Sequence, residues 1–123
     1  MSKRLRIVPE SELVVAKDRV IYASTRKVNA VAKLIRGLTL TEAAKCLYNC
    51  KRAVANDVRK VLFAAVSNAV HNNRLDPESL VVKEAYVGKA VVLRRFMARA
   101  KGSGSGIRKE FSRLTIVVCE AEV

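Results

Sequence analysis

Basic side chains gather in one stretch of the chain, residues 89–113. Eight of the chain's 24 basic residues lie there against a single acid, Glu110. They are Lys89, Arg94, Arg95, Arg99, Lys101, Arg108, Lys109 and Arg113. Cationic groups at this density would neutralise phosphates, and Phe96 and Met97 beside them would pack against bases or sugars. The stretch is therefore predicted to bind nucleic acid. The alternative is a charged loop that is simply solvated.

The same stretch is predicted to be a long β-hairpin. Residues 90–93 are typical of a strand, a return strand follows, and the Gly-Ser run at 102–106 between them indicates a hairpin loop rather than a linker. A two-stranded hairpin is marginal in water, and this one has few apolar side chains near its tip and strong like-charge repulsion. We therefore expect residues 89–113 to need surrounding anions to hold their shape.

The length, composition and net charge of the chain indicate one domain with a polyanionic partner. Its 123 residues are 50% hydrophobic, which suffices for a buried core in a single domain, residues 1–123. A net charge of +13 and a pI near 10.2 favour a polyanion as partner. The start of the chain lacks the apolar segment of an export signal, and the longest apolar run of a predicted helix, residues 61–66, is far short of the roughly 20 residues of a membrane span. We expect a soluble, intracellular protein with no membrane partner and no homo-oligomer.

The cysteines and the histidine give no metal or catalytic pattern. Cys46, Cys50 and Cys119 are odd in number, which fits a reducing compartment, and we expect them to be small buried side chains. A site of Cys46, Cys50 and His71 would match no common zinc spacing and lacks a fourth ligand. His71 has no nucleophile or orienting group in a recognisable pattern, so we expect it at the surface or a helix end.

The glycine run also fails as a nucleotide site. Residues 102–106 lack the lysine and the following helix of a phosphate-binding loop. We therefore expect no cofactor, no metal and no catalytic residues, and we predict that the chain is not an enzyme. The alternative is an enzyme that acts on RNA, and turnover of RNA by the purified chain would reveal such an activity.

The amino-terminal half predicts a strand followed by helices. Residues 13–23 suit an extended strand with an interruption at 17–19. Ser24 is a candidate N-cap for a first helix, and Gly37 ends it. The apolar positions of that helix are Val28, Val31, Ala32 and Ile35. A second helix begins near Thr39 or Thr41, where Glu42 gives capping-box spacing, and runs to about residue 49.

The rest of the chain predicts one long helix and the two hairpin strands. The long helix has a continuous apolar stripe. Its members are Val54, Val58, Val61, Leu62, Ala65, Val66, Ala69 and Val70. Asp76 and Pro77 mark a turn before a strand at 80–93. The return strand alternates, with Leu114, Ile116 and Val118 on one face and Thr115, Val117 and Cys119 on the other. Residues 107–113 do not alternate, as expected for the part that leaves the domain.

Several motifs of this chain resemble those of bacterial-type large-subunit ribosomal protein twenty-two. Residues 95–102, Arg-Phe-Met-Ala-Arg-Ala-Lys-Gly, are similar to the Arg-x-Met-Pro-Arg-Ala-x-Gly tip of that family. Further matches are Lys27-Val28, Val31-Ala32, residues 34–37, Asn68-Ala69 and His71-Asn72. The chain departs from the family pattern at Ala98, Ser103, Gly106, Phe111 and Arg113, and around the first helix at Tyr22, Thr25 and Asn29.

The resemblance implies an α+β fold in which three helices pack on a small antiparallel sheet with a long protruding β-hairpin. It implies a globular part at about 12–88 and 114–120 and the hairpin at about 89–113. It also implies a structural role in the large ribosomal subunit, in its assembly and in the lining of the nascent-peptide exit tunnel, and a hairpin tip close to the macrolide site. The implied partners are large-subunit ribosomal RNA, neighbouring ribosomal proteins and the nascent peptide. The implied place is the cytoplasmic ribosome, with an organellar ribosome as the alternative.

The predicted RNA-binding set extends from the hairpin onto the globular part. Beyond the residues of 89–113 given above, it includes Arg19, Lys27 and Arg36. The alternative function from another class is an architectural DNA-binding protein with a β-arm. Such arms usually act in symmetric pairs, so a stable dimer would favour that alternative.

Overall fold

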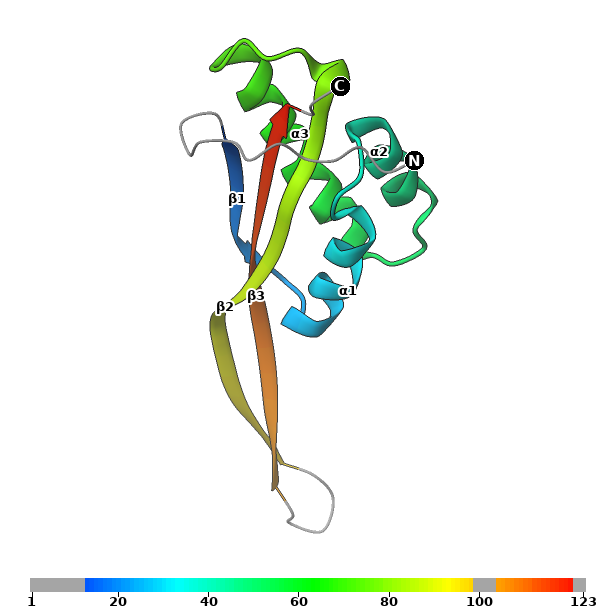
Figure 1. Cartoon of the computed structure of the whole chain (residues 1–123). Helices are drawn as coiled ribbons and strands as arrows, with labels where there is room; N and C mark the ends of the chain where they lie inside the picture. The colour runs from blue at the N-terminus through cyan, green and yellow to red at the C-terminus, as the bar shows by residue number, and fades with distance from the viewer. Residues whose placement is uncertain (1–12, 99–103, 121–123) are drawn as a thin grey trace.

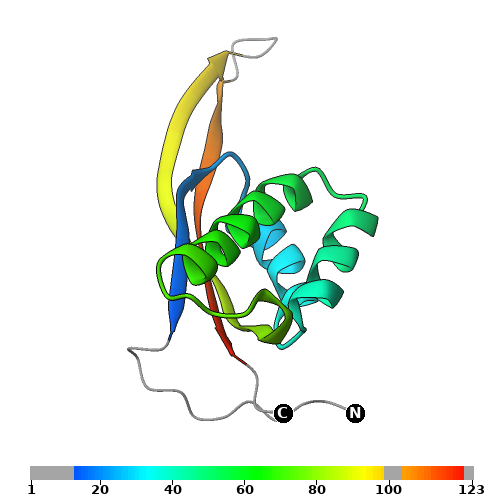
Figure 2. The same cartoon turned by 90° about the horizontal axis from the view of Figure 1, so that it is seen from above.

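The computed structural model describes residues 13–98 and 104–120, and for residues 95–98 and 104–108 the backbone alone. The elements follow in the order β1 (Val14–Ile21), α1 (Thr25–Ile35), α2 (Leu40–Asn49), α3 (Val54–His71), a 3₁₀ turn (Pro77–Ser79), β2 (Leu80–Ala98) and β3 (Gly104–Glu120). The strands form one antiparallel sheet in the order β1-β3-β2. The three helices lie on one face of this sheet (Figures 1 and 2), which confirms the predicted α+β class.

Strand β1 runs through the predicted interruption. It pairs with β3 from Val14 opposite Val118 to Asp18 opposite Leu114, and its register shifts before Ile21 pairs with Ser112. The Asp18 carboxylate accepts a hydrogen bond of 3.2 Å from the backbone N–H of Val20, a local bond that competes with regular pairing. The break is therefore a register irregularity within one strand.

Helix α1 has the predicted stripe and stop. Val28, Val31, Ala32 and Ile35 are its buried residues. Gly37 follows the helix with φ of +76°, a left-handed conformation that glycine adopts without a Cβ penalty. Ser24 is at the N-cap position as predicted, but its side chain makes no capping hydrogen bond.

Helix α2 begins at the capping box that the sequence predicts. The N–H of Glu42 donates to Thr39 Oγ1 and the N–H of Thr39 donates to Glu42 Oε2, each at 3.4 Å. These two bonds satisfy donors that the first turn of a helix leaves unpaired. The helix then buries Ala43 and Leu47 against its neighbours and ends at Asn49, as predicted.

Helix α3 is the longest helix and supplies much of the core. Its buried positions are Ala55, Val58, Val61, Leu62, Ala65 and Ala69. The predicted stripe is correct in most members, but it omits Ala55 and includes Val54, Val66 and Val70, which are only half-buried. The buried stripe therefore begins one residue later than the hydrophobic pattern suggests.

Strand β3 is buried on both faces where it lies between β1 and β2. Leu114, Ile116 and Val118 are at most 1% exposed under the helices, and Thr115, Val117 and Cys119 on the other face are at most 4% exposed. The side chains of a central strand are sheltered by those of two flanking strands, which explains burial on the side without helices. Alternation correctly assigned the two faces.

The three cysteines differ in environment. No disulfide joins them, and Cys119 is buried as expected. The expectation of burial is wrong for Cys46, which is exposed, because this position lies on the outer face of α2. Within the described residues, no helix combines the length and apolarity that crossing a membrane requires.

Candidate nucleic-acid interface

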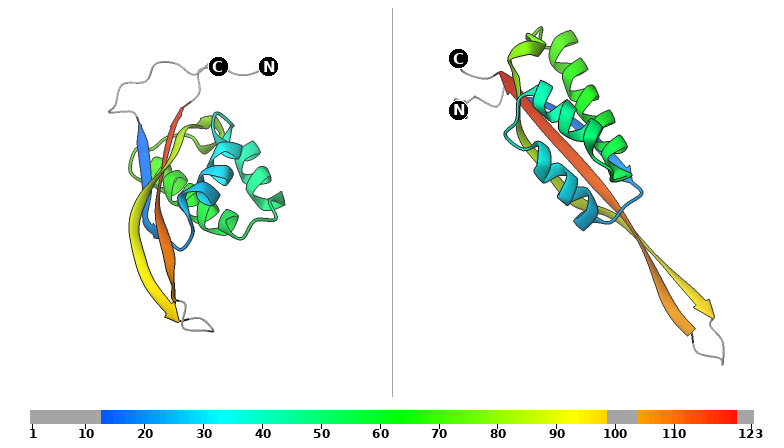
Figure 3. Two further views of the ribbon diagram at one scale, coloured as in Figure 1. Left: turned by 90° about the horizontal axis from the view of Figure 1, so that it is seen from below. Right: turned by 90° about the vertical axis from the view of Figure 1, so that its right-hand side faces the viewer.

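In the part of the chain that the structure describes, the sheet continues beyond the end of β1 as the two strands β2 and β3. The last pair of β1 is Ile21 with Ser112, whereas β2 and β3 remain paired from there to Ala98 opposite Gly104. We call residues 89–98 of β2 and 104–113 of β3 the arm. Figure 3 shows the arm extending well past the helices. The register of β2 shifts between Lys89 and Val92, where the arm leaves the domain, and such bulges increase the local twist.

Basic residues occupy both faces of the arm. Lys109 and Arg113 share one face of β3 because side chains alternate along a strand. Lys89 pairs with Ser112, which belongs to the opposite, helix-side face, and Arg94 shares that face through its pairing with Arg108. All four side chains that are described here, those of Lys89, Arg94, Lys109 and Arg113, are exposed. A partner that surrounds the arm would meet positive charge on either side.

The pairing of the arm places like charges opposite each other. Arg94 is the cross-strand partner of Arg108, and the neighbouring pairs are Leu93 with Lys109 and Arg95 with Ile107. Like charges at directly opposed positions destabilise a strand pair. An enclosing anion would remove this repulsion, so the register supports the expectation that the arm is stabilised by its partner.

The most specific part of the predicted tip is not described at the level of side chains. For Arg95, Phe96, Met97 and Arg108 the structure gives the backbone, and Arg99 and Lys101 lie outside the described residues. Their roles in binding RNA stay predictions.

The basic residues of the globular part have two different roles. Arg19 on β1 and Lys27 on α1 are exposed. Arg36, just after α1, donates from Nε to the carbonyl oxygen of Ala85 at 2.6 Å and from an Nη to Asn29 Oδ1 at 2.7 Å. Arg36 therefore ties α1 to β2, and only the rest of its guanidinium group can face a partner.

An aromatic pair at the base of the arm was missed by the sequence reasoning. Tyr22 and Phe111 have ring centroids 5.0 Å apart at an interplanar angle of 79°, an edge-to-face contact. Next to it, Ser112 Oγ donates a 2.6 Å hydrogen bond to the carbonyl oxygen of Ala23. The sequence does contain an aromatic residue, Tyr22, at the end of the predicted first strand. It does not show that Tyr22 contacts Phe111, because the two residues are distant in sequence.

A hollow lies between helices α2 and α3. It has a volume of about 930 Å³ and is lined mostly by apolar and aromatic groups. They include Leu40, Ala44, Tyr48, Phe63 and Val66.

In the described part of the chain no group of three or more His, Cys, Asp or Glu side chains could hold a metal ion. His71 is exposed at the end of α3, where it was expected.

The fold and the arm define a class of small basic α+β proteins whose charge extends along a projecting hairpin. The chain matches the family described as "Ribosomal protein L22p/L17e" over residues 16–119. The chain therefore belongs to the ribosomal protein L22p/L17e family, which confirms the resemblance seen in its motifs. Members of this family are structural, non-enzymatic constituents of the large ribosomal subunit, and the same is true of this chain.

Curated relatives agree with this assignment over nearly full length. The "Large ribosomal subunit protein uL22" of Methylobacterium sp. (strain 4-46) is 50% identical over 115 residues, which cover 94% of this chain and 90% of the relative. The protein of the same name from Caulobacter vibrioides is 46% identical over 118 residues, 96% of this chain and 93% of the relative. That from Zymomonas mobilis is 46% identical over 117 residues, 95% and 91%.

Proposed function

We propose that this chain binds large-subunit ribosomal RNA through its arm, supports assembly of the subunit, and lines the nascent-peptide exit tunnel with its hairpin. The observation that carries the proposal is the presence of exposed cations on both faces of a two-stranded arm that projects from the helical body. RNA recognition relies heavily on phosphate contacts from such side chains. Membership of the family and the reach of the arm both support the proposal that the hairpin lines the tunnel.

The globular part and the hairpin of the chain would have different roles. Residues 12–88 and 114–120 would form the globular part of a single domain, and residues 89–113 would enter the RNA. At strand rise, ten residues extend roughly 33 Å, so the arm can contact RNA well away from the body. Neighbouring ribosomal proteins and the nascent peptide would be further partners, and we expect no homo-oligomer. The chain would work in the cytoplasmic ribosome.

The salt dependence of RNA binding tests the role of the arm. We expect Arg94→Gln, Lys109→Gln and Arg113→Gln each to weaken binding to a large-subunit ribosomal RNA transcript. Each lost phosphate contact should flatten the slope of log affinity against log salt by about 0.7–0.9 unit, because fewer counterions are released. Lys33→Gln, on the exposed side of α1 and away from the arm, is the charge-matched control. Slopes that stay at the wild-type value in all three arm variants would refute the assignment.

The DNA-binding alternative predicts a different crosslinking result. The arm variants above leave open which nucleic acid is bound, so crosslinking in cells is needed in addition. We expect residues of the arm to crosslink to large-subunit ribosomal RNA. A predominantly DNA signal, together with a stable dimer of the free protein, would favour the architectural role instead.

A further inference from the structure

We propose that a hollow at the base of the arm binds one unpaired nucleotide of the RNA, with its base stacked on Tyr22 and its phosphate held by Lys27 and Arg52. This inference rests on the proposed function and names a second contact point for the same RNA. It concerns the junction of β1, α1 and the start of α3, outside the hairpin itself. Neither Tyr22 nor Arg52 was among the residues that the sequence predicted to bind RNA.

The hollow has the size and lining that such a ligand requires. Its volume is about 430 Å³, within the roughly 300–1,000 Å³ of pockets that hold small organic ligands. Two turns line it, the one between β1 and α1 and the one before α3. The lining residues are Tyr22, Ala23, Lys27, Arg52, Ala53 and Val54. One aromatic wall and two cations around small apolar side chains suit a flat base that carries a phosphate.

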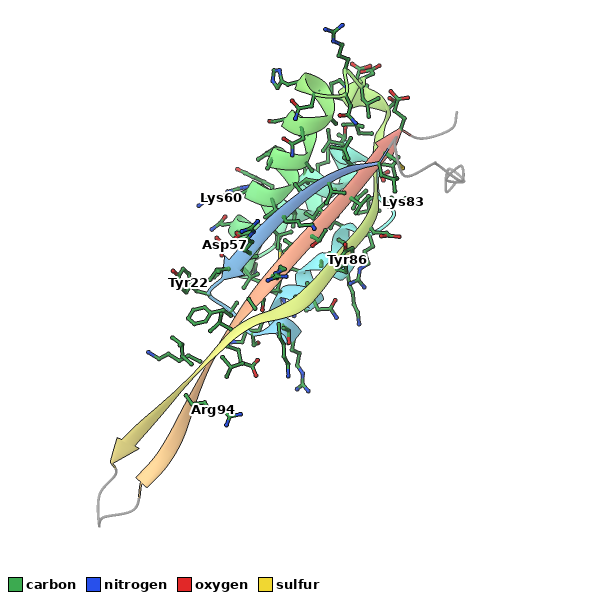
Figure 4. The ribbon with its side chains drawn as sticks, turned by 90° about the vertical axis from the view of Figure 1, so that its left-hand side faces the viewer. Tyr22, Asp57, Lys60, Lys83, Tyr86 and Arg94 are labelled. Atoms are coloured by element: carbon green, nitrogen blue, oxygen red, sulfur yellow. The ribbon has the colours of Figure 1, made fainter. Side chains whose placement is uncertain are left out.

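Tyr22 is both accessible and held in place. Its side chain is 83% exposed, so most of the ring is available to a ligand. Phe111 contacts the ring edge-to-face from β3. The backbone of the next residue is fixed by two hydrogen bonds, from the Ala23 N–H to the carbonyl oxygen of Ile21 at 2.8 Å and from Ser112 Oγ to the carbonyl oxygen of Ala23 at 2.6 Å. Figure 4 shows Tyr22 at the end of β1, next to the point where the arm departs. A ring that is already ordered loses little entropy when a base stacks on it.

The charges around the hollow favour an anion. Among the described residues, the charged side chains that line it are Lys27 and Arg52, and both are exposed. Neither side chain makes a hydrogen bond or ion pair with another described residue, and Arg52 uses only its backbone carbonyl oxygen, which accepts from the Ala55 N–H at 3.1 Å, so both side chains can turn toward a phosphate. Asp57 lies in the first turn of α3 but does not line the hollow. The two lining cations therefore face no competing carboxylate within the hollow.

Two other hollows are less suited to a nucleotide. The hollow between α2 and α3 offers a mostly apolar surface. A third, of about 410 Å³, includes Tyr86, Arg26 and Arg36, but the Arg36 guanidinium already bonds to Ala85 and Asn29. In the hollow at Tyr22, the side chains of both cations have no bond to another described residue, and most of the Tyr22 ring is exposed in spite of its contact with Phe111. It also adjoins the arm, so RNA bound along the arm passes close to it.

Substitutions at Tyr22 separate stacking from charge. We expect Tyr22→Leu to lower the affinity of the full-length chain for a large-subunit ribosomal RNA transcript by about 5- to 150-fold, the loss of one stacked base, without changing the salt slope. Tyr22→Phe keeps the ring and should bind like the wild type. Lys27→Gln and Arg52→Gln should lower both the affinity and the salt slope, whereas Lys33→Gln should change neither. The melting temperature of each variant shows whether the fold is retained.

The outcomes distinguish this inference from the proposed function. If the arm variants weaken binding while Tyr22→Leu binds like Tyr22→Phe, the nucleotide site is refuted and the role of the arm stands. If neither set weakens binding, both are refuted.

Crosslinking identifies the ligand directly. A photoreactive phenylalanine analogue at position 22, in assembled large subunits, should crosslink to an unpaired nucleotide of the ribosomal RNA. A crosslink only to protein, or only to base-paired RNA, would overturn the inference.

Discussion

At the scale of single residues, Arg36 and Arg94 show that equal charge does not imply an equal role. Arg36 donates to Ala85 and Asn29 and so joins α1 to the sheet, whereas Arg94 is exposed on the arm opposite Arg108. The first contributes to the stability of the free protein. The second opposes the pairing of its own strands until an anion is present.

A substitution at Arg36 tests this difference. We expect Arg36→Gln to lower the free energy of unfolding by about 1 kcal/mol, because the shorter amide loses hydrogen bonds made by a charged group that is partly open to water. Urea unfolding measures the change. In the same assay Arg94→Gln should leave stability unchanged or raise it slightly, and equal losses in the two variants would show that the contacts of Arg36 contribute nothing specific.

At the scale of elements, local patterns account for the helices well. The capping box of Thr39 and Glu42 and the glycine stop at Gly37 are short-range features, and the structure has both. Ser24 has the same position at the start of α1 but makes no side-chain cap, so a cap residue in the sequence did not guarantee a capping bond. The two helices therefore begin with different support.

The two caps give a matched comparison. Thr39→Ala should cost about 1 kcal/mol of stability, because it removes the acceptor for the Glu42 N–H. Ser24→Ala should cost much less, because that hydroxyl makes no capping bond. Thermal or denaturant unfolding of both variants provides the measurement. A larger loss for Ser24→Ala than for Thr39→Ala would contradict this account of the two helix starts.

What the sequence could not predict was contact between distant segments. The helix stripes and the alternation of β3 depend on neighbours three, four or two residues away, so one sequence suffices to find them. The Tyr22–Phe111 contact, the bond from Ser112 to Ala23 and the bond from Arg36 to Ala85 depend on how the sheet brings remote segments together. The basic arm could be predicted, and the aromatic hollow at its base could not.

At the scale of the whole molecule, the chain combines a well-packed body with an arm that has little core. The hydrophobic core lies between the three helices and the inner part of the sheet, and the buried residues of the sheet extend as far as Ile21 and Ser112. Beyond that point, the described side chains of the arm are exposed or half-buried. Stability should therefore fall along the same two strands from the body to the tip, because the outer pairs bury little apolar surface.

Hydrogen exchange of backbone amides, on the free protein and on the protein bound to ribosomal RNA, tests this account most directly. We predict strong protection for the inner pairs, such as Ile116 with Ala85, in both states. Amides of the outer arm, around Arg94 and Lys109, should exchange readily in the free protein at physiological salt and become protected on binding RNA. Strong protection of the outer arm in the free protein would contradict the claim that surrounding anions hold it in shape.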